Sequence, residues 1–419
     1  MVDNSFRQYI PRHAEALVEQ ALADTRVVLV NGARQCGKST LARRVAARHD
    51  GQWLSFDNPQ TLAQAHFDPV SLVTSDRLVI IDEVQRYPEI LLTIKQIVDE
   101  HPRPGSFLIT GSAHVMGLRS VPDTLPGRVE TIELWPFSQG EIDGTPDGFI
   151  DVAFQYPREL TATSDLGRAD YAERIARGGF PEAIGRTERR RASFLSNYVA
   201  DLVNRDVTQV AEIQRGMEFR QILNLLAGQT SGLLVPANLA MATGLSKTTV
   251  SRYLAVMAEV FLTKITPAWS RGTTGRTTKT PKLQFVDSGV AVRLAGHDSR
   301  SLLRQDAPIG PMLESFVAME LARQATWSQT AVQLFHYRTK DGQEVDILLQ
   351  DALGRTIGIE VKASSTVRGD DFRGLSHLAQ RLGDDFLAGV VLYTGGVTSR
   401  FGDRLVAMPV SALWQTRRA

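Results

Sequence analysis

The sequence contains one cysteine, Cys36, among its 419 residues. This excludes intrachain disulfides and zinc sites made of cysteine, and it fits a reducing compartment such as the cytoplasm. The 47 Lys+Arg and 46 Asp+Glu residues give a formal net charge of +1, so a nucleic-acid partner would need a local basic surface. The apolar runs, such as VVLV and LVII, are too short to span a membrane. The segment MVDNSFRQYIPRH lacks the apolar core of a signal peptide. We expect a cytoplasmic protein with no membrane partner.

The order of apolar stretches predicts an α/β protein of more than one domain. Up to residue 134, strand-length apolar segments alternate with helical ones, which is typical of a parallel sheet covered on both faces. Pro136 and the Gly/Asp/Pro-rich run 140–148 end this part. A helical middle follows, and the last part mixes strands and helices. We therefore predict three domains, covering residues 1–145, 146–290 and 291–419.

A phosphate-binding loop follows the first apolar strand. The stretch GARQCGKST contains the pattern GxxxxGK[ST] and opens a helix, which is the context that gives this pattern its meaning. Glycines permit a tight loop whose N–H groups converge on phosphate oxygens. We expect Lys38 to reach the β- and γ-phosphates and Ser39 to bind Mg²⁺, with ATP and Mg²⁺ as cofactors. The residues predicted to bind the nucleotide are Gly32, Ala33, Arg34, Gln35, Cys36, Gly37, Lys38, Ser39 and Thr40. Cys36 itself is either a small residue at a variable position or a redox-sensitive one.

A second apolar strand ends in two adjacent carboxylates, in the stretch LVIIDEVQ. Carboxylates at the end of a buried strand carry an electrostatic cost that a metal ion can offset. Asp82 is the expected Mg²⁺ ligand and Glu83 the residue that polarises the attacking water. The alternative is a pair that caps a following helix.

The third strand, FLITGSA, ends in Thr110 and Ser112. At this point the sequence resembles the AAA+ ATPases, in which a polar residue on this strand senses the γ-phosphate. The resemblance implies this role for Ser112 first and Thr110 second. In LPGRVE it implies that Arg128 is an arginine finger that completes the site of a neighbouring subunit, and hence a homo-oligomer, such as a ring.

The order of motifs along the whole chain is similar to that of a prokaryotic family. Its members join an AAA+ ATPase domain to a C-terminal domain of unknown function. The matching stretches are GARQCGKST, IDEVQ, ITGSA, PGRVE, GGFPEA, NRDV, FVDSGVAVRL, LESFVAMEL, HYRTKDGQEVDILL and GIEVKAS.

Residues 236–261 resemble a winged helix-turn-helix, with a turn at Gly244 and Ser246 as cap of the second helix. The segment 264–286 after it carries five basic residues and no acidic one, as a wing that contacts phosphates would. The alternative is a module that only packs or oligomerises. The basic residues of the wing are Lys264, Arg271, Arg276, Lys279 and Lys282. The predicted DNA-binding residues are Lys247, Thr248 and Arg252, with Thr249 beside them, and Arg271, Arg276 and Lys279 of the wing.

The C-terminal part carries the stretches GQEVDILL and GIEVKAS. Strand alternation puts Glu360 and Lys362 on one face, and Asp346 lies on the preceding strand. With Glu314 on a helix, the set resembles the PD-(D/E)xK nuclease fold. That resemblance implies a metal held by Asp346 and Glu360, with Glu314 and Lys362 as further catalytic residues. The alternative is a salt-bridged surface pair on a fold that has lost activity.

Together these features predict an ATP-hydrolysing AAA+ protein that acts on DNA. Branched or structured DNA in repair or recombination is the expected setting. The alternative is an ATP-dependent signalling or toxin–antitoxin-linked switch, in which the C-terminal domain only binds a protein partner. Salt-sensitive DNA binding distinguishes the two.

Overall fold

The structure is a computed structural model of the chain that describes residues 9–112, 125–207, 216–272 and 279–416. The chain forms two compact units. We call Tyr9–Phe137 with Glu259–Phe261 the N-terminal unit, and Ser138–Ala258 with Leu262–Ala419 the C-terminal unit. The division into three domains stays a prediction.

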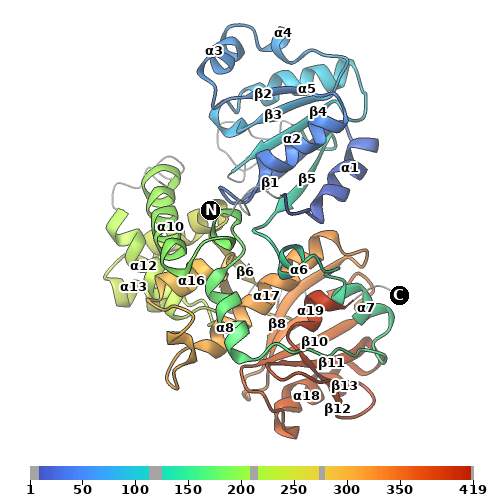
Figure 1. Ribbon diagram of the computed structural model, residues 1–419, viewed down its shortest axis with the longest axis vertical. Helices are drawn as coiled ribbons and strands as arrows, with labels where there is room; N and C mark the ends of the chain where they lie inside the picture. The colour runs from blue at the N-terminus through green and yellow to red at the C-terminus, as the bar shows by residue number, and fades with distance from the viewer. Residues whose placement is uncertain (1–8, 113–124, 208–215, 273–278, 417–419) are drawn as a thin grey trace, which may run out of the picture. The chain divides into compact units, whose positions relative to one another are not determined.

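The N-terminal unit is a parallel sheet of five strands in the order β2-β3-β4-β1-β5 (Figure 1). Its elements are α1 (Ala14–Asp24), β1 (Val27–Gly32), α2 (Lys38–Arg48), β2 (Gln52–Ser55), α3 (Pro59–Phe67), α4 (Pro69–Val73), β3 (Val79–Asp82), the 3₁₀ turn η2 (Val84–Arg86), α5 (Ile90–Glu100), β4 (Phe107–Gly111) and β5 (Val129–Leu134).

Helices cover both faces of this sheet because its strands are apolar on both sides. The strand β1 is buried at every position, and alternate side chains of a strand point to opposite faces. The helices α1 and α2 pack on one face. On the other, Val27, Leu29, Val79 and Ile81 share a core with side chains of α5. Since all five strands are parallel, their carboxyl ends meet at one edge, where β1, β3 and β4 end in polar residues.

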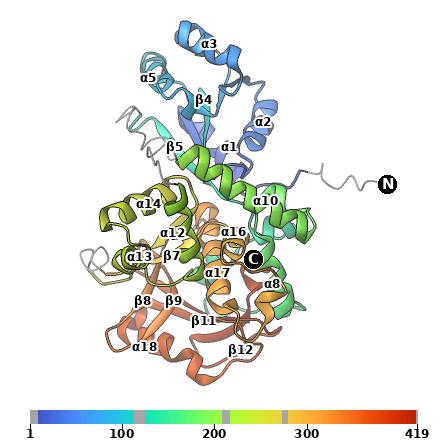
Figure 2. The same cartoon turned by 90° about the vertical axis from the view of Figure 1, so that its left-hand side faces the viewer.

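The C-terminal unit begins with helices. These are α6 (Gln139–Asp143), α7 (Phe149–Gln155), α8 (Arg168–Arg177), α9 (Pro181–Ile184), α10 (Glu188–Asp201), the π-helix η4 (Leu202–Val207), α12 (Gly216–Gly228), α13 (Pro236–Thr243), α14 (Lys247–Glu259) and, after the hairpin β6 (Thr263–Thr266) and β7 (Lys282–Phe285), α16 (Ser288–Leu294) and the 3₁₀ turn η5 (Ser301–Leu303). Figure 2 shows α12, α13 and α14 grouped together, and the rings of Phe219 on α12 and Tyr253 on α14 lie 5.4 Å apart.

The rest of this unit is a mixed sheet of six strands in the order β12-β13-β11-β10-β9-β8. Its elements are α17 (Ile309–Trp327), β8 (Val332–Arg338), β9 (Glu344–Asp351), β10 (Thr356–Lys362), η6 (Gly369–Phe372), α18 (Arg373–Leu382), η7 (Gly383–Asp385), β11 (Phe386–Tyr393), β12 (Ser399–Arg400), β13 (Leu405–Pro409) and α19 (Ala412–Gln415). The helix α18 packs on β9, β10 and β11, and α17 contacts β10. The expected α/β class is confirmed, with a parallel-sheet domain first, a helical middle and a mixed α/β domain last.

Two glycine-containing motifs of the middle region pack against each other. Asp287 caps α16 by accepting the N–H of Val290 at 3.0 Å, and it also accepts the N–H of Gly179 at 2.7 Å. A Cβ at Gly178, whose φ is +68°, would lie 2.4 Å from Oδ1 of Asp287. The motifs GGF and DSG therefore have a structural explanation, because only glycine fits beside the buried carboxylate.

Within the described ranges, each helix is too short or too polar to cross a membrane.

Candidate nucleotide site and C-terminal carboxylate cluster

The loop between β1 and α2 is folded as the sequence pattern predicts. Gln35 and Gly37 both have left-handed backbones, with φ of 60° and 104°, and α2 begins at Lys38. A Cβ at Gly32 would lie 2.1 Å from the carbonyl oxygen of Leu134 at the end of β5. A side chain at position 32 would therefore push the loop away from β5, which is a physical reason for the first glycine of the pattern.

Lys38 and Ser39 are the first two residues of α2, directly after the loop. The Lys38 side chain is buried, and its ammonium donates to the carbonyls of Gly32 and Ala33 at 3.0 and 2.8 Å. The Ser39 hydroxyl donates to Asp82 Oδ1 at 2.8 Å. A hydroxyl and a carboxylate are ligands that Mg²⁺ accepts beside phosphate oxygens, so the residues present fit Mg²⁺-ATP.

Neighbouring strand ends complete this site. Thr110 on β4 donates to Asp82 Oδ1 at 2.6 Å and accepts the N–H of Glu83 at 3.1 Å. Glu83 has φ 61° and ψ 47°, a left-handed conformation that is uncommon for a residue with a side chain and is often found at functional sites. The structure thus brings Lys38, Ser39, Asp82, Glu83 and Thr110 together at one edge of the sheet.

Sequence reasoning missed Gln85. Its amide nitrogen donates to Glu83 and, at 2.8 Å, to the Ser112 hydroxyl, while its amide oxygen accepts the N–H of Ser112 at 3.3 Å. Gln85 therefore holds the Glu83 carboxylate and connects it to Ser112. The signal was present in the sequence, because Gln85 follows Glu83 by two positions in IDEVQ.

Cys36 lies behind the loop. It is fully buried, and its Sγ donates to the carbonyl of Leu134 at 3.2 Å. This environment favours the packing role for Cys36, since a buried thiol is inaccessible to oxidants.

Arg128 precedes β5 at the opposite end of the sheet from the loop. Its guanidinium forms an ion pair with Asp99, with Nη2 2.9 Å from Oδ2, and the hydrogen bond from Arg128 holds the pKa of Asp99 below its usual value. Because β1 and β5 run parallel, the start of β5 is far from the loop that follows β1. Within one chain Arg128 cannot reach the Lys38 site, so any role in hydrolysis must be in another subunit.

The helix-turn-helix residues are placed as the pattern predicts. Gly244 ends α13 with a left-handed backbone, and the Ser246 hydroxyl accepts the N–H of Thr249 at 3.0 Å. Lys247, Thr248 and Arg252 are exposed on α14. These side chains are therefore available to a partner.

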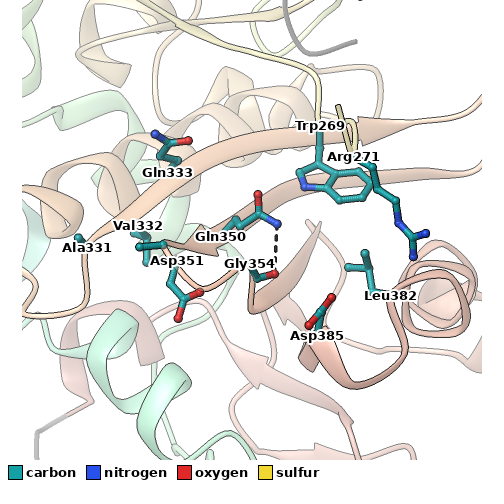
Figure 3. A pocket seen from close by; sticks show the side chains of 11 residues that line it. Trp269, Arg271, Ala331, Val332, Gln333, Gln350, Asp351, Gly354, Leu382 and Asp385 are labelled. Carbon is teal, nitrogen blue, oxygen red and sulfur yellow. Dashed lines mark hydrogen bonds between the residues drawn. The ribbon is translucent and has the colours of Figure 1, made fainter. Parts of the chain in front are cut away.

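The basic residues of the wing differ in how far they are exposed to solvent. Arg271 is exposed, donates to the carbonyl of Arg381 at 2.8 Å, and lines a cavity of about 530 Å³ with Trp269 and Asp385 (Figure 3). Lys279 is exposed, and Arg276 lies outside the described residues. Lys282, counted among the basic residues of the wing, is buried, which corrects the expectation that it could contact phosphates.

Lys282 lies among the carboxylates of the C-terminal domain. Its ammonium is 2.7 Å from Glu314, 3.0 Å from Glu344 and 3.6 Å from Asp346. The fourth acidic residue, Glu360, pairs with Lys362 at 3.0 Å. We call Glu314, Glu344, Asp346 and Glu360 the carboxylate cluster.

Burial governs the charges of this cluster. Desolvation, followed by repulsion from Asp346, raises the pKa of Glu314 to about 8, although Lys282 opposes the shift. The same two causes raise the pKa of Glu360 to about 7. Buried carboxylates of this kind need a nearby cation when ionised, and Lys282 supplies one.

In the part of the chain that the structure describes, no group of three or more His, Cys, Asp and Glu side chains is placed to hold a metal ion. Asp346 Oδ2 instead accepts the N–H of Val361 at 2.9 Å. The assignment of Asp346 and Glu360 as metal ligands stays a prediction.

Comparison with known families agrees with this organisation. Residues 24–143 match a family described as "AAA domain". Residues 168–301 match a domain of unknown function (DUF8612), and residues 309–413 match another domain of unknown function (DUF4143).

Two curated relatives are uncharacterized proteins of Mycobacterium tuberculosis and Mycobacterium bovis. Each is 28% identical over 358 residues, which cover 85% of this chain and 74% of the relative. Similar solved structures include the Walker-type ATPase of Pyrococcus abyssi, with 14% identity, 68% of this chain and 96% of that chain covered, and a TM-score of 0.41. The Holliday junction branch migration motor RuvB of Thermotoga maritima has 20% identity, 62% and 90% coverage, and a TM-score of 0.30.

The N-terminal unit therefore contains a P-loop ATPase domain of the AAA type. The chain joins this ATPase domain to a C-terminal domain of unknown function, and the predicted combination is confirmed.

Replacing Lys282 by Met should destabilise the C-terminal unit, and more so at high pH. Loss of one partner of a buried ion pair costs about 3–5 kcal/mol. Folded Glu314 keeps its proton up to about pH 8, whereas the unfolded chain loses it near its ordinary pKa of about 4.3. Stability therefore falls as pH rises through this window. Lys282 has a raised pKa, so it stays charged throughout and limits the rise of the Glu314 pKa in the wild type. Without Lys282 the Glu314 pKa rises further, and the loss of stability with pH becomes larger.

The measurement is urea unfolding of Lys282→Met and wild type at about pH 5.5 and about pH 8.5. Lys340→Met removes an exposed lysine of the same unit and should change little. If Lys282→Met lowers the free energy of unfolding by the same amount at both pH values, the charge balance assigned to Lys282 and Glu314 is wrong.

Proposed function

We propose that the protein binds and hydrolyses Mg²⁺-ATP at the site formed by Lys38, Ser39, Asp82 and Glu83, and couples hydrolysis to work on DNA. The observation that carries the first part is the hydrogen bond from Ser39 to Asp82 beside the buried Lys38 ammonium. The two proposed metal ligands, Ser39 and Asp82, therefore lie beside the same loop as the Lys38 ammonium, which is proposed to bind phosphate.

Each side chain has a distinct task in this proposal. Lys38 exchanges its two carbonyl partners for phosphate oxygens, and Ser39 and Asp82 hold the metal. Mg²⁺ held by Ser39 and Asp82 would neutralise negative charge that develops on the phosphates during hydrolysis. Glu83 orients and polarises the attacking water, and Gln85 keeps the Glu83 carboxylate in place. Thr110 and Ser112 are both within the polar network, so either can report on the γ-phosphate.

The variants Lys38→Ala and Glu83→Gln should separate binding from hydrolysis. Lys38→Ala removes the phosphate-binding cation and should abolish nucleotide binding. Glu83→Gln leaves the metal ligands intact, so it should retain ATP while turnover falls by about 10²-fold or more. Equilibrium binding and steady-state phosphate release measure the two effects.

A matched control is Glu100→Gln, which removes an exposed carboxylate of the same unit and should leave both quantities unchanged. Wild-type turnover by Glu83→Gln would show that the water-orienting role lies elsewhere.

DNA is the proposed macromolecular partner, with branched or structured DNA in repair or recombination as the proposed setting. The proposal is supported by Lys247, Thr248 and Arg252, exposed at the start of a capped second helix that has no acidic residue in its first turn. Residues at this end of such a helix read bases in helix-turn-helix proteins. Arg271 and Lys279 add positive charge for phosphate contacts, and Arg276 is part of the same proposal.

The double variant Arg271→Ala/Lys279→Ala should weaken DNA binding and flatten its dependence on salt. Loss of two phosphate contacts reduces the slope of log K against log salt by about 2. Fluorescence anisotropy with duplex and four-way DNA over a salt series measures this. Lys340→Ala/Arg368→Ala, which removes two exposed basic residues of the same unit, is the control. A wild-type protein without salt-sensitive DNA binding would favour the signalling or toxin–antitoxin switch.

Assembly and cleavage are separate proposals. If Arg128 completes a neighbour's site in a homo-oligomer, mixing inactive Arg128→Ala with inactive Lys38→Ala should restore part of the ATPase activity. Full activity from a strictly monomeric protein would exclude this.

If Glu314, Asp346, Glu360 and Lys362 cleave DNA, Mn²⁺ should support cleavage that Asp346→Ala abolishes. If the wild-type protein leaves the DNA uncut, the carboxylate cluster has a structural role only.

A further inference from the structure

Arg12 is buried against the phosphate loop although it lies outside every motif of the sequence. It precedes α1, and only 7% of its surface is exposed. Its Nη1 donates to the carbonyl of Cys36 at 2.9 Å, and its Nη2 donates to the carbonyl of Trp135 at 2.5 Å. The guanidinium carbon lies 4.3 Å from the ring centroid of Phe137. One side chain thus connects the loop with the segment after β5.

The bond to Cys36 constrains a loop N–H. The peptide group is planar and trans, so the carbonyl of Cys36 and the N–H of Gly37 lie in one plane and point in opposite directions. By holding this carbonyl, Arg12 fixes the N–H of Gly37 on the side away from itself. Backbone N–H groups at this end of a helix are the groups that bind phosphate.

The bond to Trp135 ties the loop to the segment after β5, near Phe137, where the first stretch of the N-terminal unit ends. Gly32 and Cys36 contact the neighbouring Leu134 carbonyl as well. The loop is therefore held against the end of β5 from two sides, by close packing and by a bridging cation.

We propose that Arg12 is a positioning residue of the nucleotide site, which shapes the phosphate loop by bridging Cys36 and Trp135. The proposal rests on the proposed binding of nucleotide. Lysine is a poor replacement, because its single nitrogen cannot reproduce the planar two-nitrogen fork that spans two carbonyls.

Cys36 makes this testable without nucleotide, since it is the only cysteine of the chain. The rate at which iodoacetamide alkylates Cys36 reports how often the loop opens. Arg12→Met should raise this rate about tenfold or more, with Arg12→Lys in between. The control Arg44→Met removes another cation that packs on the same N-terminal segment, over the ring of Tyr9 at 3.8 Å. It should alkylate as the wild type does.

Binding of a fluorescent ATP analogue with Mg²⁺, measured well below the melting temperature, gives the second readout. Arg12→Met should weaken binding about tenfold or more, Arg12→Lys less, and Arg44→Met should bind normally. Wild-type alkylation and affinity in Arg12→Met would overturn the proposal, as would equal effects of Arg12→Met and Arg44→Met. If Arg12→Met does not fold, Arg12→Lys decides by the same comparison. If wild type binds no nucleotide but Arg12→Met still exposes Cys36, the proposed function fails while the loop-positioning role stands.

Discussion

The close approach of Gly32 to the carbonyl of Leu134 is the constraint on which the nucleotide site depends. A methyl group at Gly32 would lie 2.1 Å from that oxygen, so the backbones of β1 and β5 can remain side by side only with glycine there. This contact sets where the loop leaves the sheet. The Cys36 thiol uses the same carbonyl, and α2 then begins with Lys38 at the carboxyl edge of the strands.

Parallel strands supply the remaining groups to that edge. Asp82 and Thr110 end neighbouring strands, and both are buried. Their mutual hydrogen bond and the bond from Ser39 satisfy a carboxylate that would otherwise be costly in this environment. Glu83, by contrast, leaves the strand in a left-handed conformation, and Gln85 and Thr110 hold it there. A polar network thus supports the strained residue, as at many catalytic sites.

In the C-terminal unit, Lys282 supplies the positive charge that the buried carboxylate cluster needs. Lys282 comes from the hairpin of the middle region, yet it contacts carboxylates of the following α/β domain. The hairpin is therefore part of the packing between these two regions. This role does not conflict with DNA contacts by the exposed residues of α14, because they lie on another element.

The sequence by itself determined the local chemistry: the phosphate loop, the acidic pair at the end of β3, the capped helix-turn-helix and the α/β class. Those features depend on neighbours in the chain, such as glycine spacing, strand-length apolar runs and a serine cap, so a linear pattern contains them. Only the tertiary structure decided which distant groups meet. Arg12 reaches Cys36 and Trp135, Lys282 reaches Glu314, and Gln85 reaches Ser112 beyond the next strand. Their burial and the resulting pKa shifts follow from packing between elements, which no periodicity or spacing encodes.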